Sequence, residues 1–186
     1  MANVEGRATA ITVLTPVKPG WWVWLKILFW LGGHVTASLK KLHQLSFIHY
    51  ARWVVVRRLP AGAPEGGGDT LHHTYLLFES NFNGTWDEYI DAFSEVVSLR
   101  MRAIWGSSYG FPGPLPVEPF KAYIRRNELV ANHYWSAYPD ATTTEIISAE
   151  RLAGALHGLR QRAEGLSTSE FRDAYVDLLT QHQRDL

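Results

Sequence analysis

The chain contains no cysteine among its 186 residues. This excludes disulfides, zinc sites with thiolate ligands and a cysteine nucleophile, but it leaves the redox compartment open. Lysine plus arginine equals aspartate plus glutamate at 18 each, so the formal net charge is zero. A chain without a basic excess is not expected to bind nucleic acid, and a near-neutral chain has little charge to keep copies apart, which favours self-association.

The sequence also lacks a membrane-spanning run and a secretory signal. The most apolar stretch, GWWVWLKILFWLGG at 20–33, would be about 21 Å long as a helix, which is shorter than the roughly 30 Å hydrocarbon core. The N-terminal MANVEGRATAI has an early acid and no charged segment leading into an apolar core, so we expect a cytoplasmic protein. Only Lys26 interrupts the tryptophan-rich stretch, which favours burial against protein. Weak peripheral contact with a membrane surface is the alternative.

Motifs for nucleotide binding, serine hydrolysis and metal binding are missing too. No GxGxxG, Walker A, GxSxG, HxH or HExxH pattern occurs. His72 and His73 are adjacent, so their side chains would point apart in a strand. We predict no metal site and no cofactor. Haem stays open as an alternative, because His34, His43 and His157 fall on predicted helices where an axial ligand could lie.

Aromatic residues are plentiful, with eight each of Trp, Tyr and Phe. They suit an aromatic-lined pocket, and they equally suit ordinary core packing. β-branched and aromatic runs predict strands at 8–15, 47–59, 72–82 and 129–138. Helical spacing of apolar residues predicts helices at 20–46, 85–105, 119–129, 142–165 and 167–182. Three of these helices begin with capping boxes, formed by Thr85 and Glu88, Thr142 and Glu145, and Ser167 and Glu170.

The element order β-α-β-β-α-β predicts a ferredoxin-like α+β protein with two extra C-terminal helices. The expected antiparallel sheet has the strand order 4-1-3-2, with both long helices on one face. We expect a single domain over 1–186, with a core at about 8–138 and a helical extension at about 140–186. Both faces of strands 47–59 and 72–82 are mainly apolar, so the face without helices needs a cover, and a second copy of the chain is favoured.

Three stretches, HYARWVVV, LLFESNFNGTWDEYIDAF and YWSAYPD, resemble a bacterial group of unassigned activity within the dimeric α/β-barrel superfamily. This resemblance implies a homodimer with a cleft between the open sheet face and the surrounding helices. The superfamily includes cofactor-independent monooxygenases, haem-degrading enzymes, haem enzymes and small-molecule isomerases or decarboxylases. Their catalytic motifs do not map onto residues of this chain, so the resemblance assigns no catalytic residue.

The candidate catalytic residues are two histidines on predicted strands, His49 and His133, which could act as acid or base at neutral pH. Strand alternation sends His49 and Arg52 to opposite faces, and we favour the set of His49 and Trp53 as the lining of the cleft. Arg52 has a second interpretation as an ion-pair partner of Glu79 or of an acid in the C-terminal part of the chain. The candidate substrate-binding residues are Arg52, Asn81, Trp86, Trp105, Tyr134 and Tyr138.

Each of these candidates also has a plain structural interpretation as a core, capping or turn residue, and the loop 106–119 fits either a lid or a rigid connector. The leading function hypothesis is an enzyme that oxygenates or isomerises a hydrophobic small molecule without a bound metal. The alternatives are a non-catalytic haem- or lipid-binding protein, and a peripheral membrane or scaffold protein that uses residues 20–33.

Overall fold

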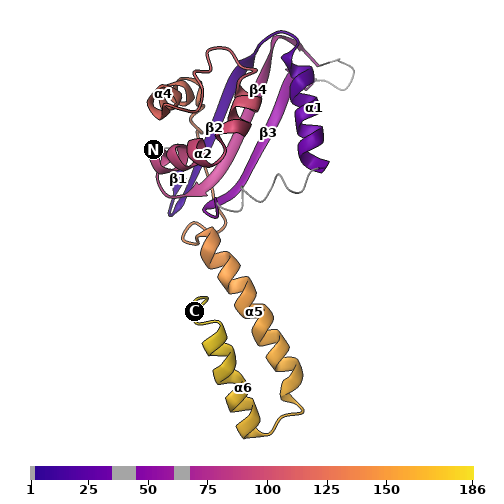
Figure 1. The fold of residues 1–186 in the computed structure, drawn as a ribbon, viewed down its shortest axis with the longest axis vertical. Helices are drawn as coiled ribbons and strands as arrows, with labels where there is room; N and C mark the ends of the chain where they lie inside the picture. Colours follow the sequence, from indigo (N-terminus) through magenta and orange to yellow (C-terminus); the bar gives the residue numbers. More distant parts are fainter. Residues whose placement is uncertain (1–2, 35–44, 61–67) are drawn as a thin grey trace. The chain divides into compact units, whose positions relative to one another are not determined.

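The structure is a computed structural model that describes residues 3–34, 45–60 and 68–186. The chain divides into two compact units, the first ending at Asp140 and the second beginning at Ala141 (Figure 1). Each unit is described by itself.

The first unit is built on a four-stranded antiparallel sheet. Its strands are β1 (Val4–Glu5), β2 (Ala8–Val17), β3 (Ile48–Arg58) and β4 (Thr70–Asn83), in the spatial order β1-β2-β4-β3. The predictions of an α+β protein with an antiparallel sheet and of its first three strands are therefore confirmed. These three strands lie side by side in the expected relative order, with β4 between β2 and β3.

The predicted fourth strand at 129–138 is wrong, since no strand forms there. Separate segments share the free edge of β2 instead. β1 pairs with its first residues, the amide of Leu129 donates to Thr12 O at 2.8 Å, and the amide of Tyr109 donates to Pro16 O at 2.9 Å. Beyond Leu129, the backbone amides of Ala131 and Ser136 donate to side chains and not to a neighbouring strand. A continuous ladder along β2 is therefore excluded, because β1 already occupies part of that edge.

The described residues of the first unit form four helices: α1 (Trp21–His34), α2 (Trp86–Val96), α3 (Ser98–Trp105) and α4 (Val117–Asn127). The single helix predicted over 85–105 is interrupted at Val97, whose φ of −119° and ψ of 23° are not helical. Two consecutive β-branched residues, Val96 and Val97, weaken the helix at this point. The second half of the predicted helix 20–46, including His43, lies outside the described residues.

The helices cover one face of the sheet with an aromatic core. Trp53 on β3, Phe78 on β4 and Trp105 at the end of α3 pack together, and the ring of Phe78 lies 5.1 Å from the rings of both tryptophans. Phe82 stacks on Tyr89 of α2 at 3.9 Å. In Figure 1, α4 lies beside β2 and next to α2. The opposite sheet face is the one that this core does not fill.

Helix α1 departs from the prediction that it is buried against protein. Leu25 is fully buried and Phe29 packs near Trp53 with ring centres 6.5 Å apart, which fixes one side of the helix on the core. Most other apolar residues of α1 are exposed: Trp21, Val23, Trp24, Ile27, Trp30 and Leu31. Within a single chain, therefore, most of the described apolar side chains of this helix are not buried.

The second unit consists of α5 (Thr143–Ala163) and α6 (Thr168–Gln181), as the sequence predicts. Leu159 and Leu178 are its buried apolar residues. Near the chain end, Ser148 donates to Asp185 at 2.9 Å, and His182 lies 3.0 Å from the other carboxylate oxygen of Asp185. These contacts hold the pKa of the Asp185 carboxyl below its usual range, mainly through His182.

All three predicted capping boxes are present, and the one at Thr85 gives a first test of the fold. Glu88 Oε2 accepts from the Thr85 amide at 3.0 Å, and Thr85 Oγ1 accepts from the Glu88 amide at 3.3 Å. We expect Thr85→Ala to lower the free energy of unfolding by about 1 kcal/mol, because an amide at the helix start loses its acceptor. Thr85→Ser keeps the hydroxyl and should retain most of this stability. Urea unfolding followed by tryptophan fluorescence reports on the first unit, because all 8 tryptophans precede Ala141.

Candidate functional site

The candidate site is the sheet surface opposite the aromatic core, which we call the open face. β2, β4 and β3 contribute alternate residues to it, and the strand register places these residues in four rows. The rows are Ala10, Asn81 and Tyr50; Thr12, Glu79 and Arg52; Leu14, Leu77 and Val54; and Pro16, Tyr75 and Val56.

The open face is divided into a polar half and an apolar half. The first two rows carry amide, hydroxyl and charged groups, whereas the last two are almost entirely apolar. Tyr50 is 48% exposed and Val54 is 39% exposed, so both halves reach solvent in a single chain. The open face is thus polar at one end and apolar at the other, and no described element of the first unit packs on its apolar half.

An ion pair marks the boundary between the two halves. Arg52 Nε donates to Glu79 Oε2 at 2.6 Å, and Arg52 Nη2 contacts the same oxygen. The Glu79 side chain is 22% exposed and that of Arg52 is 63% exposed. Because a guanidinium has five N–H donors, this pairing leaves donors on Arg52 for another acceptor. The ion-pair interpretation of Arg52 is confirmed, and it is compatible with a second contact to a ligand.

Two further candidates lie close to Tyr50 of the polar half: His49 precedes it in β3, and Tyr134 approaches it. His49 occupies a β-bulge between Ile48 and Tyr50, and its buried Nε2 has no hydrogen-bond partner among the described residues. Burial raises the pKa of the Tyr134 hydroxyl, and the nearby Tyr50 and Glu5 raise it further. Tyr134 therefore reaches the row that contains Tyr50, although its own segment is not a strand.

The structure does not bring all the predicted site residues together. Trp105 is 1% exposed in the aromatic core, so it is not available as a pocket residue. Trp53 faces the helices, and the preference for its alternation set as the cleft lining is wrong. His133 and Tyr138 lie exposed on the irregular segment after α4, and Tyr138 is 71% exposed. Among the described residues, no hydrogen bond or ion pair joins His49 to His133.

Sequence reasoning missed Tyr50, Tyr75 and Leu77 as open-face residues. Their signal was present, because Tyr50 shares the alternation set of Arg52, and Tyr75 and Leu77 share that of Glu79 and Asn81. Both alternation sets of these strands are mainly apolar in the sequence. Only the position of the helices shows which set faces away from the core.

Trp86 is the first residue of α2. It lines a hollow of about 510 Å³ with Asn3, Val4, Thr9, Ala10, Arg125, Glu128 and Val130. The Arg125 guanidinium lies 4.5 Å from the centre of the Trp86 ring and also approaches Asp87 at 3.5 Å. Burial raises the pKa of the Glu128 carboxyl in the same hollow. Trp86 thus packs against the Arg125 guanidinium, which is its structural role here.

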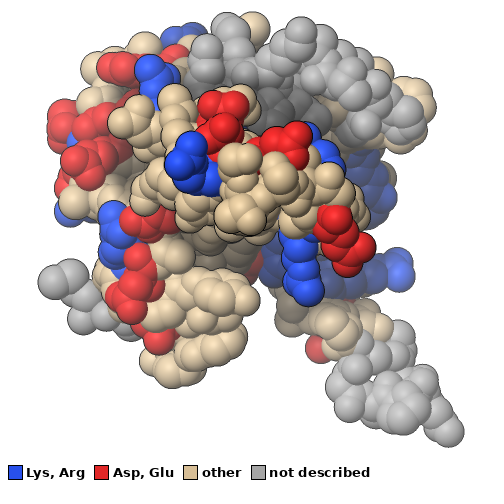
Figure 2. All heavy atoms as spheres, turned by 90° about the horizontal axis from the view of Figure 1, so that it is seen from below, with Lys and Arg blue, Asp and Glu red and all other residues tan. Residues whose placement is uncertain are grey.

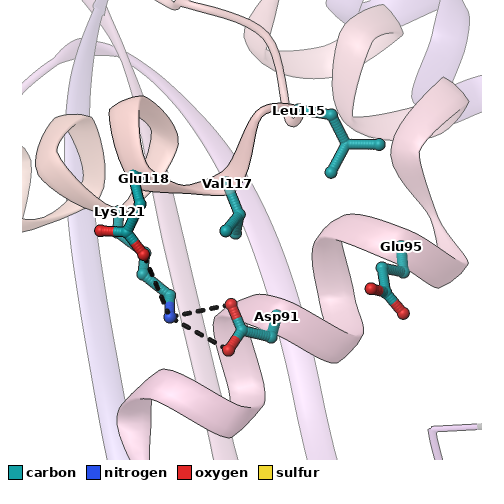
Figure 3. Close-up of a pocket in the computed structure, with 6 residues that line it drawn as sticks. All are labelled: Asp91, Glu95, Leu115, Val117, Glu118 and Lys121. Carbon is teal, nitrogen blue, oxygen red and sulfur yellow. Dashed lines mark hydrogen bonds and ion pairs between the residues drawn. The ribbon is translucent and has the colours of Figure 1, made fainter.

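Figure 3 shows a second hollow, between α2 and α4. Lys121 Nζ lies 2.8 Å from Asp91, 3.2 Å from Asp87 and 3.9 Å from Glu118. Its hydrogen bond to Asp91 is the largest cause of the raised pKa of Lys121. The amine therefore stays protonated at neutral pH. It joins α4 to α2 through ion pairs and is not available as a nucleophile.

Neither a cluster of metal-binding side chains nor a surface of one charge marks a further site among the described residues. Within residues 3–34, 45–60 and 68–186, no group of three or more His, Asp or Glu side chains is placed to hold a metal ion. Acidic and basic side chains both occur on the face drawn in Figure 2, and neither sign covers it. In comparisons with known proteins, no family model, no curated protein and no solved structure matches this chain.

Proposed function

We propose that the chain is a homodimer of the dimeric α/β-barrel type that holds a hydrophobic small molecule between its open faces. The observation that carries the proposal is the open face itself. It places a half-buried ion pair between a polar and an apolar half, on a sheet whose other face is already filled by its core.

Self-association follows from the apolar half. Leu14, Leu77, Val54 and Tyr75 form a continuous surface across three strands. Contiguous exposed apolar surfaces mark interaction sites, and a two-fold axis lets the same surface serve both partners. The formal net charge of zero opposes this association little.

Ligand binding follows from the polar half. Asn81, Tyr50 and Tyr134 supply hydrogen-bonding groups, and Arg52 has donors left over from its pair with Glu79. A molecule with an apolar body and one acceptor group, such as a carbonyl or carboxylate, matches this division. His49 is the proton-handling candidate for an enzymatic step, because its Nε2 is buried without a partner among the described residues.

The first test is the oligomeric state and its dependence on the open face. We expect a dimer for the natural chain in native mass spectrometry, and a monomer for Val54→Asp, because a carboxylate would be buried without a partner at the interface. The monomer fold should tolerate this change, since Val54 is 39% exposed. Val130→Asp is the matched control, because Val130 is 69% exposed on the segment after α4 and off the open face, and it should remain dimeric.

The same spectra test the ligand. A dimer with an added mass that disappears in Val54→Asp supports binding between the open faces, and the added mass identifies the molecule. A Soret band in the absorbance spectrum would favour the haem-binding alternative over an enzyme without a bound metal. A monomeric natural chain would overturn the proposal.

A further inference from the structure

Helix α1 presents an apolar surface on the outside of the first unit. Trp30 is 63% exposed, Ile27 48%, and Trp24 43%. At 100° per residue these residues lie on one side of the helix with Val23 and Leu31, while Leu25 lies on the other. A surface helix of a globular protein normally carries polar residues on its outer side, so this exposed apolar side is a candidate docking surface.

The helix is fixed in this orientation. Leu25 is fully buried, and the indole of Trp24 donates to Ala103 O on α3 at 2.9 Å. Phe29 packs near Trp53 of β3. Turning the apolar side inward would break these contacts, so the exposed side is a stable feature of the fold.

Basic residues flank the helix beside this apolar side, around Trp21 and Trp22. Arg57 lies 3.8 Å from the ring centre of Trp22, Lys26 lies 5.2 Å from the same centre, and Lys18 lies 5.9 Å from that of Trp21. Helix α1 packs against β3 and α3. These three elements contain no acid, and their basic residues are Lys26, Arg52, Arg57, Arg58, Arg100 and Arg102.

This positive charge is local, because the net charge of the chain is zero. Arg52 is paired with Glu79 on the open face, and Asp69, directly before β4, lies beside the end of β3, where its backbone carbonyl accepts from the Leu59 amide. By contrast, α2 carries only acids among its charged residues. An occupant of the α1 surface should therefore be apolar with a negatively charged rim.

We propose that α1 docks the protein on the surface of an anionic lipid bilayer, lying in the interface with its exposed tryptophans among the headgroups. Tryptophan is favoured at that depth, and an apolar helix face with basic flanks is the feature of interfacial helices. The 14 residues of α1 extend about 21 Å, which is too short to cross. No described helix has the length and apolar character needed to span a membrane.

Charge favours the bilayer over a second copy of the chain at this surface. A two-fold contact through α1 would place the same basic rim against itself, with repulsion between like charges. A contact with the acidic helix α2 of another copy would compete with Lys121 and Arg125, which already pair with Asp87 and Asp91. An anionic surface neutralises the rim without either cost. Each basic residue near such a surface raises the partition coefficient roughly five-fold.

Co-sedimentation of the full chain with vesicles tests this proposal. We expect binding to phosphatidylcholine vesicles containing 30% phosphatidylserine (about physiological anionic content), and much weaker binding to pure phosphatidylcholine. Trp30→Ser should lower the partition coefficient roughly ten-fold, because apolar area no longer leaves water. Trp135→Ser is the matched control, since Trp135 is 68% exposed outside α1, and it should bind as the natural chain does.

A charge reversal gives a second, independent measurement. Lys26→Glu should weaken binding to the anionic vesicles and leave binding to neutral vesicles unchanged, whereas Arg160→Glu on α5 should change neither. Circular dichroism checks that each variant is folded. Failure of the natural chain to sediment, or equal sedimentation of the natural chain and Trp30→Ser, would overturn the proposal. A shift to a smaller assembly in Trp30→Ser without vesicles would assign the surface to a second copy instead.

Discussion

Trp105→Ala is expected to lower the free energy of unfolding of the first unit by about 3–5 kcal/mol. Trp105 is 1% exposed and contacts the rings of Trp53, Phe78 and Phe93 with centre distances of 6.3, 5.1 and 6.4 Å. Truncation would leave a cavity bounded by three aromatic rings, which the sheet and α2 are too rigid to close. Since small domains are stable by only about 5–15 kcal/mol, this single change would remove much of the margin.

Urea unfolding followed by circular dichroism and by the remaining tryptophans measures the effect. Trp105→Phe should cost much less, because it keeps an aromatic ring and removes an indole N–H that has no partner among the described residues. Trp135→Ala is the exposed control and should change stability by under about 0.5 kcal/mol. A small loss for Trp105→Ala would contradict its place in the core and restore it as a ligand-binding residue.

Removing one partner of the Arg52–Glu79 pair is expected to weaken the proposed dimer by about 3–5 kcal/mol, or roughly two to four orders of magnitude in the dissociation constant. The pair lies in the middle of the open face, so a second copy would exclude water from it. Glu79→Ala would then leave the guanidinium buried and unpaired. The double variant Arg52→Ala/Glu79→Ala should recover part of the loss, because no isolated charge remains.

Analytical ultracentrifugation of the four proteins of this cycle gives the coupling energy. If the open face stays in water, the coupling should be only about 0.2–1 kcal/mol, as for other exposed pairs. The Arg125–Asp87 pair is the control, because its side chains are 61% and 58% exposed on the helix-covered side, and its removal should not change the dissociation constant. A small coupling energy between Arg52 and Glu79 in an intact dimer would show that the dimer forms through another surface.

Local signals in the sequence were sufficient for most of the secondary structure. Thr85, Thr142 and Ser167 were recognised as helix starts because a capping box acts over only four residues. Strands β2, β3 and β4 were recognised from β-branched and aromatic runs. The strand at 129–138 was predicted from the same kind of run, but pairing depends on a free edge, and β1 shares that edge.

The candidate site was predicted less well because it depends on which face the helices cover. Arg52, Asn81 and Tyr134 reach the open face or its polar end, whereas Trp105 lies in the core and Trp86 serves Arg125. Both alternation sets of β3 are apolar, so periodicity alone did not distinguish them. The packing of Trp53 against Phe78 and Trp105 shows which of the two sets faces the helices.

By itself, the sequence determined the α+β class, the order of the paired strands, the starts of three helices and the absence of thiol chemistry. These features depend on composition and on contacts within a few residues. Only the tertiary structure decided that Arg52 meets Glu79 on an open face, that Trp105 is buried, and that α1 turns its tryptophans outward. Those outcomes depend on contacts between residues far apart in the chain, and no local pattern specifies them.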